Sequence, residues 1–416
     1  MTSEINQSVV VEVGGGRVRG VVEGAVSVFR GIPYARAVRF GEPEAVAPWR
    51  GVREAREFGV AAPQLASRLA RAMGGFEVAQ GEECLSLNVW APVGDGHPVL
   101  VFMHGGGFSS GAGSLGWYDG AEMAALGDVV VVTVNYRLGP LGFLRLPGVS
   151  AGNLGLLDQI AALGWVRDNI AAFGGDPGRV TAAGQSAGAI SLVAMLSGER
   201  AEGLFQQVIL QSPPLGMLPD TPDAAARTGA KFLQELGVTA GELGAVPVDA
   251  LLAAQVAVAK GFGGQVVPPF QLVGDGVVVA ADPVAAVSGR ADGIPMLLGT
   301  TKDEASAFFS DDWDAVAAVS EQIFGGPTRR LSESREAAWL FEFDWYPEGS
   351  PFRACHCLEL PFLLGTAAAW RHAPMLQGER PQGLVDEMRG SWLGFIKDGD
   401  PGWERGNARH FTGRSC

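Results

Sequence analysis

The sequence predicts an α/β protein whose central sheet is mostly parallel and is flanked by helices. Apolar residues make up 47% and charged residues 18% of the 416 residues, which suits a globular core and excludes a disordered chain. Residues 128–137, DVVVVTVNYR, form a continuous β-branched run of the kind found in strands buried on both faces. Downstream of this run, strand patterns alternate with helical patterns, as they do in proteins with a parallel sheet.

The first quarter of the chain is predicted to form strands and turns. Residues 8–22 hold two β-rich runs separated by three glycines at 14–16, which is a hairpin signal. Residues 85–92 and 98–106 have the composition of two further strands, and the turn GDGH lies between them.

The middle of the chain alternates between helices and strands. Residues 153–175 have helical apolar spacing and end in a glycine pair, which is typical of a helix C-terminus. A short strand at 178–184, an apolar helix at 187–198 and a strand at 206–212 are expected to follow. Residues 221–260 are rich in Ala and Leu and predict a helical excursion from the sheet.

The last third of the chain is predicted to complete the sheet. Residues 294–301 and 338–345 have strand character, and residues 384–399 predict a closing helix. Residues 324–339 are expected to form only a brief polar bridge, and the tail from about residue 403 is atypical, with no predicted element.

Composition also limits the partners and the compartment. With 31 Lys and Arg against 45 Asp and Glu, the net charge is −14, so nucleic-acid binding is not expected. No run of about 18 apolar residues predicts a membrane span, and the N-terminus lacks the pattern of a signal peptide. Because the four cysteines do not form a disulfide pattern, we expect a cytoplasmic protein. No repeat or linker divides the chain, so we expect a single domain over residues 1–416.

The pentapeptide GQSAG at residues 184–188 has the G-x-S-x-G pattern. The pattern alone is weak, because Gly, Ser and Ala are common in this chain. Its context is informative, because it follows a predicted strand and opens a predicted helix, which is the arrangement of a nucleophile elbow. Ser186 would then stand at a helix N-terminus, where free backbone N–H groups can stabilise an oxyanion.

A second glycine-rich motif, HGGGF at residues 104–108, follows an apolar strand. It is either a flexible turn or part of an oxyanion hole, since glycine lets backbone N–H groups approach a substrate oxygen. The presence of both motifs in this order favours the oxyanion hole.

A serine nucleophile needs a base and an orienting acid, which follow it in the chain order serine, acid, histidine. Three of the five histidines follow Ser186. His356 comes soon after a predicted strand, whereas His372 falls in a predicted helix and His410 in the tail, so we favour His356. The candidate acids, Asp303 and Glu304, both follow a predicted strand, and spacing does not choose between them.

Several long motifs occur in an order that is typical of one known family. They are FRGIPYA (29–35), GEECLSLNVWAP (81–92), HGGGF, NYRLGPLGF (135–143), GNLGLLDQIAALGWVRDNIAAFGGDPGRVTAAGQSAGA (152–189), GTTKDEA (299–305) and CHCLELPF (355–362). In these motifs the chain resembles the type-B carboxylesterase/lipase family, which includes bacterial para-nitrobenzyl esterases and the cholinesterases. The resemblance covers residues 9–402 and implies an α/β-hydrolase fold, here with a shortened helical cap region.

The resemblance also implies roles for individual residues. It makes Ser186 the nucleophile, Glu304 the acid and His356 the base, and it places oxyanion donors at the backbones of Gly106, Gly107 and Ala187. By the same resemblance Ser212 lies close to the triad, and the remaining candidates around the triad or in the pocket are Gln185, Phe108 and Phe362.

The expected function is that of a serine carboxylesterase that hydrolyses uncharged esters through an acyl-enzyme and needs no metal or cofactor. A metal site at Cys355-His356-Cys357 is not expected, because zinc takes four ligands and no second cluster lies nearby in the sequence. Two alternatives remain: an amidase or carbamate hydrolase with the same triad, and a catalytically silent binding protein of this fold. The short segment 324–339 leaves open whether the site is unusually open or the chain folds poorly. The sequence does not indicate the oligomeric state.

Overall fold

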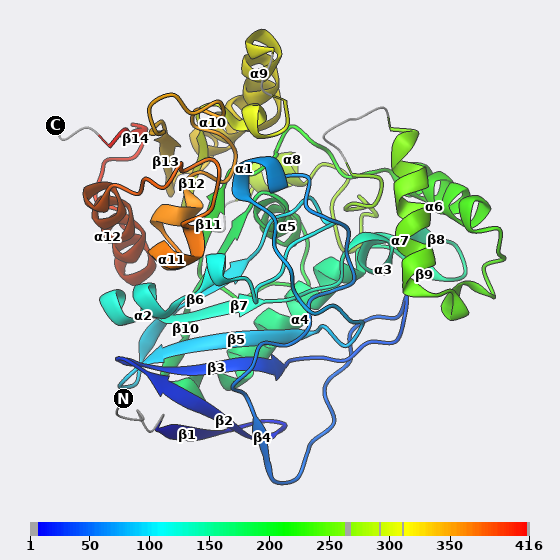
Figure 1. Cartoon of the computed structure of the whole chain (residues 1–416), viewed down its shortest axis with the longest axis horizontal. Helices are drawn as coiled ribbons and strands as arrows, with labels where there is room; N and C mark the ends of the chain where they lie inside the picture. The colour runs from blue at the N-terminus through cyan, green and yellow to red at the C-terminus, as the bar shows by residue number, and fades with distance from the viewer. Residues whose placement is uncertain (1–6, 263–267, 291–292, 310–311, 414–416) are drawn as a thin grey trace.

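The structure is a computed structural model, and it describes residues 7–262, 268–290, 293–309 and 312–413. Its centre is one large sheet, antiparallel from β1 to β7 and parallel from β7 to β14 (Figure 1). In spatial order the strands are β1 (Ser8–Val13), β2 (Gly16–Glu23), β3 (Val26–Pro33), β5 (Ser86–Pro92), β7 (Val130–Val134), β6 (His97–Met103), β10 (Gly175–Gln185), β11 (Gln207–Gln211), β12 (Met296–Thr301), β13 (Ala338–Phe343) and β14 (Arg409–Phe411), with β4 (Val52–Glu54) beside β2.

Helices cover both faces of this sheet. On one face α4 and α5 pack on the strands, and on the other face α2 and α12 do so (Figure 1). The helices are α1 (Ala70–Met73), α2 (Ala121–Gly127), α3 (Gly139–Phe143), α4 (Leu154–Asn169), α5 (Ala187–Leu196), α6 (Pro222–Leu236), α7 (Val248–Lys260), α8 (Pro283–Ser288), α9 (Trp313–Val319), α10 (Gly326–Glu333), α11 (Ala367–Trp370) and α12 (Gln382–Asp398).

Strand β7 shows why the central strands lack polar alternation. Val130, Val132 and Val134 belong to the core beneath α4 and α5, whereas Val131 belongs to the core beneath α2 and α12. Successive side chains of a strand point to opposite faces, so a strand covered on both faces must be apolar throughout. The prediction of a doubly covered, mostly parallel sheet is therefore confirmed.

The predicted helical excursion is also present. Helices α6 and α7 pack on each other and stand beside α3 and a small ribbon formed by β8 (Arg145–Leu146) and β9 (Ser150–Ala151) (Figure 1). Among the described residues, no helix has both the length and the apolar character that a membrane crossing requires.

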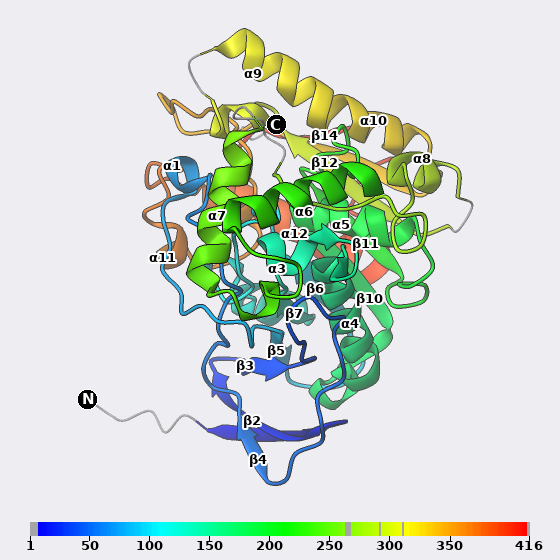
Figure 2. The same cartoon turned by 90° about the vertical axis from the view of Figure 1, so that its right-hand side faces the viewer.

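The prediction of a brief polar bridge at residues 324–339 is wrong. A π-helical segment, η5 (Ser320–Gly325), joins α9 to α10, and together they form one long helical rod (Figure 2). The rod is amphipathic: Phe324 and Leu331 are buried, whereas Arg329, Arg330 and Glu333 are exposed.

The prediction of a tail without regular structure is wrong as well. Strand β14 pairs in parallel with β13 at the edge of the sheet. Phe411 is fully buried, with its ring 5.9 Å from that of Trp392 and 6.4 Å from that of Phe341. One aromatic residue thus anchors the strand, while His410 stays exposed beside Glu342.

Candidate active site

Ser186 occupies the sharp turn between β10 and α5. Its backbone has φ 54° and ψ −116°, a conformation that is costly for any residue other than glycine. Two hydrogen bonds hold it there: the Ser186 N–H donates to the Gln211 carbonyl oxygen at 2.9 Å, and the Ile190 N–H donates to the Ser186 carbonyl oxygen at 3.0 Å. The neighbouring strand and the helix thus support the strained turn from both sides.

The glycines at both ends of the motif are required by close packing. A Cβ atom at Gly184 would lie 2.5 Å from the carbonyl carbon of Gly188, and one at Gly188 would lie 2.1 Å from the carbonyl oxygen of Met103. Neither contact can be relieved by rotating a side chain, because each involves backbone. The G-x-S-x-G spacing therefore follows from the geometry of the turn, as the sequence predicts.

Glu304 and His356 meet in the interior of the protein. His356 Nδ1 forms a short hydrogen bond with Glu304 Oε2, and both side chains are almost completely buried. The second oxygen, Glu304 Oε1, accepts a hydrogen bond from the Thr301 N–H at 2.9 Å, which fixes the carboxylate at the end of β12. Asp303, the other candidate acid, instead exchanges hydrogen bonds with the backbone of Ala354.

The free edge of the His356 ring faces the elbow. Its Nε2 atom is 3.1 Å from the side-chain nitrogen of Gln185, the residue immediately before Ser186. With Nδ1 held by a carboxylate, Nε2 is the acceptor of the neutral ring, and Gln185 donates to it. The rings of Phe308 and Phe324 pack near the imidazole, at 5.6 and 5.2 Å between ring centroids.

Gly106 and Gly107 follow β6 and line the same pocket as Ser186 and Ala187. Both have left-handed backbones, with φ of 115° and 58°. In the described part of the chain, neither of their N–H groups has a hydrogen-bond acceptor. Ala187 is the first residue of α5, where N–H groups lack intrahelical partners. Donors are thus available on two sides of Ser186.

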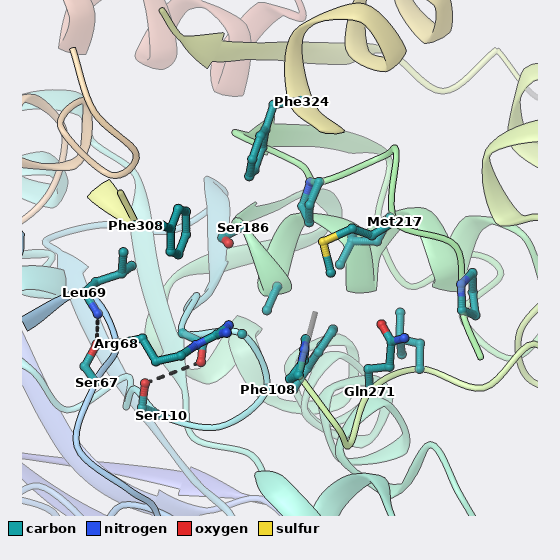
Figure 3. Close-up of a pocket in the computed structure, with 18 residues that line it drawn as sticks. Ser67, Arg68, Leu69, Phe108, Ser110, Ser186, Met217, Gln271, Phe308 and Phe324 are labelled. Atoms are coloured by element: carbon teal, nitrogen blue, oxygen red, sulfur yellow. Dashed lines mark hydrogen bonds between the residues drawn. The ribbon is translucent and has the colours of Figure 1, made fainter. Parts of the chain in front are cut away.

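The pocket at Ser186 is mainly apolar and encloses about 690 Å³ of empty space, including the part open to solvent. Figure 3 shows Phe308 beside Ser186, Phe324 on one side of it, and Phe108 and Arg68 on the opposite side. The apolar side chains that line it are Leu69, Phe108, Ile190, Pro214, Met217, Pro219, Pro268, Leu272, Phe308 and Phe324.

The remaining candidates lie in different places. Phe108 lines the pocket, as expected. Phe362 does not: its ring packs against Phe343 and Trp345, at 5.1 and 5.2 Å, on the far face of the sheet, because the chain turns into a short helix after His356. Ser212 is buried at the end of β11, and its N–H donates to the Gly299 carbonyl oxygen at 2.8 Å, so it supports the strands beneath the site.

Sequence reasoning missed a buried acid beside the triad, Glu359. Burial, followed by the charge of Glu304, raises the pKa of Glu359 to about 7, and its Oε1 accepts a hydrogen bond from the Gln211 amide at 3.2 Å. The sequence contains an indication of this buried acid, because Glu359 is the single charged residue in the apolar run LELPF. The wall residues Arg68, Met217, Phe308 and Phe324 gave no such signal, because they lie in segments without a motif.

His104 and the cysteines beside His356 are structural. Desolvation lowers the pKa of His104 to about 4, and its ring stacks on Tyr136 at 4.3 Å. Burial raises the pKa of Cys355 and of Cys357, which disfavours the thiolate form that binds metals. Within the described ranges, no three His, Cys, Asp or Glu side chains are grouped so that they could hold a metal ion.

A parallel sheet with a serine elbow after a central strand, and an acid–histidine pair at the same edge, defines an α/β hydrolase. Comparison with known proteins agrees. The sequence model of the carboxylesterase family matches residues 7–324, and this chain belongs to that family. It is a carboxylic-ester hydrolase.

Curated relatives align over nearly their whole length. A probable N-octanoylanthranilate hydrolase of Rhodococcus erythropolis is 39% identical, over 92% of this chain and 92% of the relative. The para-nitrobenzyl esterase of Bacillus subtilis is 37% identical, over 94% of this chain and 90% of the relative.

Solved structures share the same architecture. A thermophilic PNB esterase superimposes with a TM-score of 0.88 at 34% identity, over 97% of this chain and 96% of that one. A carboxylesterase of Geobacillus stearothermophilus superimposes with a TM-score of 0.84 at 33% identity, with the same coverage.

Proposed function

We propose that this chain is a serine carboxylesterase that acts on esters with an apolar acyl chain through an acyl-enzyme at Ser186. The observation that carries the proposal is the buried Glu304–His356 pair, whose Nε2 faces Gln185, the residue before Ser186 in the elbow. The apolar wall of the pocket supports an apolar acyl chain, which gains about 0.8 kcal/mol for each buried methylene group.

In the proposed mechanism, His356 Nε2 exchanges the Gln185 amide for the hydroxyl of Ser186 and removes its proton as Oγ attacks the ester carbonyl carbon. Glu304 holds the imidazole in the tautomer that can accept this proton and stabilises the imidazolium. The oxyanion is bound by the backbone N–H groups of Gly106, Gly107 and Ala187, and losing one such donor typically costs about a hundredfold or more in kcat.

The acyl-enzyme then breaks down by the reverse steps. His356 gives its proton to the leaving alcohol, and the acyl group stays bonded to Ser186 Oγ. Water enters, His356 removes a proton from it, and the resulting hydroxide attacks the acyl carbon. The acid leaves as Ser186 recovers its proton. These steps use only side chains and backbone amides of this chain.

The test is hydrolysis of para-nitrophenyl acetate, butyrate and decanoate by wild-type protein and by Ser186→Ala. We expect activity that falls by about 10⁴-fold or more in Ser186→Ala. Ser197→Ala is the matched control, because it removes a hydroxyl from the other end of the α5 segment and should retain activity. A folded wild-type protein that hydrolyses none of these esters would favour the catalytically silent binding protein.

Amide hydrolysis by the same triad is a second candidate. It is favoured by the N-octanoylanthranilate hydrolase, whose name describes an N-acyl substrate. The comparison is the rate on N-octanoyl-4-nitroaniline against that on para-nitrophenyl octanoate. A higher kcat/KM for the anilide, lost in Ser186→Ala, would identify an amidase, whereas a strong preference for the ester supports the esterase.

A further inference from the structure

The pocket contains a cation that the catalytic steps do not use. Arg68 lies in the loop that precedes α1 and lines the pocket together with Ser67 and Leu69. Its Nη2 atom is 2.8 Å from the position that a methyl group at Gly107 would occupy, so the guanidinium lies over a proposed oxyanion donor. Figure 3 shows the side chain reaching from the loop toward the centre of the pocket.

The loop that carries Arg68 is attached to the body of the protein. Ala61 and Gln80, on either side of it, form a β-bridge. The Ala72 carbonyl oxygen of this loop accepts a hydrogen bond from the Met375 N–H, which lies outside the loop, at 2.8 Å. Leu69 and Met73 of the loop are buried. The position of Arg68 is therefore set by backbone hydrogen bonds and apolar packing.

The charge of Arg68 is unusual for its surroundings. Among the described residues that line the pocket, it is the only charged side chain, and no acid stands among them, although the chain as a whole carries a net charge of −14. Arg68 is exposed as a residue, but the surrounding protein removes enough water to lower its pKa from the usual value. Guanidinium remains protonated at neutral pH even so.

An arginine in this position suits an anionic ligand. A guanidinium carries five N–H donors in a planar fork, so it can bind a carboxylate with two parallel hydrogen bonds while it keeps contacts with the protein.

The geometry also indicates which part of the substrate carries the charge. The leaving oxygen must face His356, which is flanked by Phe308 and Phe324. Arg68 lies on the other side of Ser186 from Phe324 (Figure 3). A group that reaches Arg68 therefore belongs to the acid part of the ester and not to the alcohol.

We propose that Arg68 makes this site selective for esters whose acyl part carries a second, negatively charged carboxylate, such as half-esters of dicarboxylic acids. The inference rests on the proposed function of Ser186. It differs from the expectation of uncharged esters in the charge of the acyl part. The apolar wall would hold the methylene groups between the two ends of the acyl part.

The experiment compares two matched pairs of substrates. The acyl pair is mono-para-nitrophenyl glutarate and para-nitrophenyl pentanoate, which differ in a terminal carboxylate. The alcohol pair is 4-carboxyphenyl pentanoate and its neutral methyl ester. The measured quantity is the ratio of kcat/KM for the anionic to that for the neutral member of each pair, at low and high NaCl.

We expect Arg68→Gln to lower the ratio for the acyl pair by about tenfold to a hundredfold, the range for a charge-assisted hydrogen bond, and to leave the alcohol pair unchanged. Arg68→Lys should recover part of the ratio, because it keeps the charge without the planar fork. High salt should lower the wild-type ratio for the acyl pair.

Arg71→Gln is the matched control. It removes the same charge three residues away, from a side chain that packs over the ring of Phe352 and not on the pocket. We expect it to leave both ratios unchanged, which would separate a local contact from a change in net charge.

Three results would contradict the inference. One is an unchanged kcat/KM of Arg68→Gln for both members of the acyl pair, and another is a change confined to the alcohol pair. The third is an equal loss of kcat/KM for the neutral and anionic esters, which leaves the ratio unchanged and would assign Arg68 to the oxyanion hole. If the wild-type protein hydrolyses para-nitrophenyl pentanoate while one of these results is found, only the inference about Arg68 fails. If the wild-type protein hydrolyses no ester at all, the proposed function fails as well.

Discussion

The two sides of the active-site pocket differ in how the chain builds them. The reacting side consists of the turns that follow β6, β10 and β12 and of the segment after β13 that carries His356. A Cβ at Gly188 would collide with backbone there, and Glu304 and His356 are buried. The facing wall consists of longer excursions: the loop of Arg68, the segment of Met217 and the helical rod around Phe324.

We infer that the reacting side determines the catalytic steps and that the facing wall determines which substrates are selected. On the reacting side, hydrogen bonds hold the Ser186 backbone against β11, the Glu304 carboxylate at the end of β12 and the His356 ring on Glu304. Catalytic geometry needs to be rigid at these groups. The wall is made of side chains from segments that the sheet does not constrain, and such segments vary in length and sequence without disturbing the reacting groups. Substitutions on the two sides should accordingly change different quantities.

The largest effect is expected from His356→Ala. Without a base, Ser186 keeps its proton, and kcat for para-nitrophenyl butyrate should fall by about 10⁴-fold or more for all acyl lengths alike. Steady-state rates with three acyl lengths measure this. A loss that depended strongly on acyl length would place His356 in the wall instead of the reacting side.

A smaller effect, on stability, is expected from Glu359→Gln. The pKa of about 7 in the folded protein exceeds the usual 4.5, so the folded state keeps a proton that the unfolded chain releases between these pH values. Wild-type stability should therefore fall as the pH rises through this window, and the loss above pH 7 is on the order of 3 kcal/mol. Glutamine can still accept the Gln211 hydrogen bond but does not titrate.

Urea unfolding at pH 5 and pH 8 measures the Glu359 prediction. The free energy of unfolding of Glu359→Gln should rise relative to wild type between the two pH values. Glu57→Gln, an exposed counterpart, should follow the wild type. Parallel curves for Glu359→Gln and wild type would mean that Glu359 titrates normally.

Gly107→Ala should affect catalysis through backbone position. The substitution keeps the N–H but places a Cβ against Arg68 at φ 58°, and a displacement of about 1 Å can cost up to a hundredfold in rate. We expect a tenfold to hundredfold loss. Gly24→Ala is the control, because it has a φ of 59° with nothing near its Cβ, and it should lose stability but no activity. Equal activities of the two variants would contradict the proposed role of the Gly107 N–H as an oxyanion donor.

The smallest effect is expected from Phe324→Leu on the wall. A smaller side chain enlarges the pocket beside His356, so the ratio of kcat/KM for decanoate to that for acetate should rise by a few fold, since each methylene group is worth about 0.8 kcal/mol. The rate on acetate itself should change little. A large loss on acetate with no change in the ratio would mean that the ring acts by positioning the imidazole.

The same division explains what could be predicted from the sequence. The doubly covered strand β7, the elbow at Ser186 and the glycines around it follow from local rules of burial and backbone geometry, so the sequence sufficed for them. Spacing does not distinguish Glu304 from Asp303, since both acids follow the same strand, and only the family resemblance favours Glu304. In the structure Glu304 contacts His356, whereas Asp303 contacts the backbone of Ala354.

The sequence did not predict the pocket wall or the edge strand β14, and the reason is physical. Residues 324–339 look polar because an amphipathic helix exposes its charges, and Phe411 ties down a tail whose neighbours are polar. Arg68 reaches Gly107 by a tertiary contact across 39 positions in the chain, which no local pattern encodes.

The proposed function requires Ser186 to be the nucleophile, and covalent labelling of the active site tests this most directly. The protein is inactivated with a para-nitrophenyl alkylphosphonate, which leaves a stable phosphonyl group on a serine nucleophile, and the modified peptide is identified by mass spectrometry. We predict one label per chain, on Ser186, in proportion to the activity lost. Full inactivation with the label on another residue would contradict this role of Ser186, as would an unlabelled Ser186→Ala variant that hydrolyses butyrate at the wild-type rate.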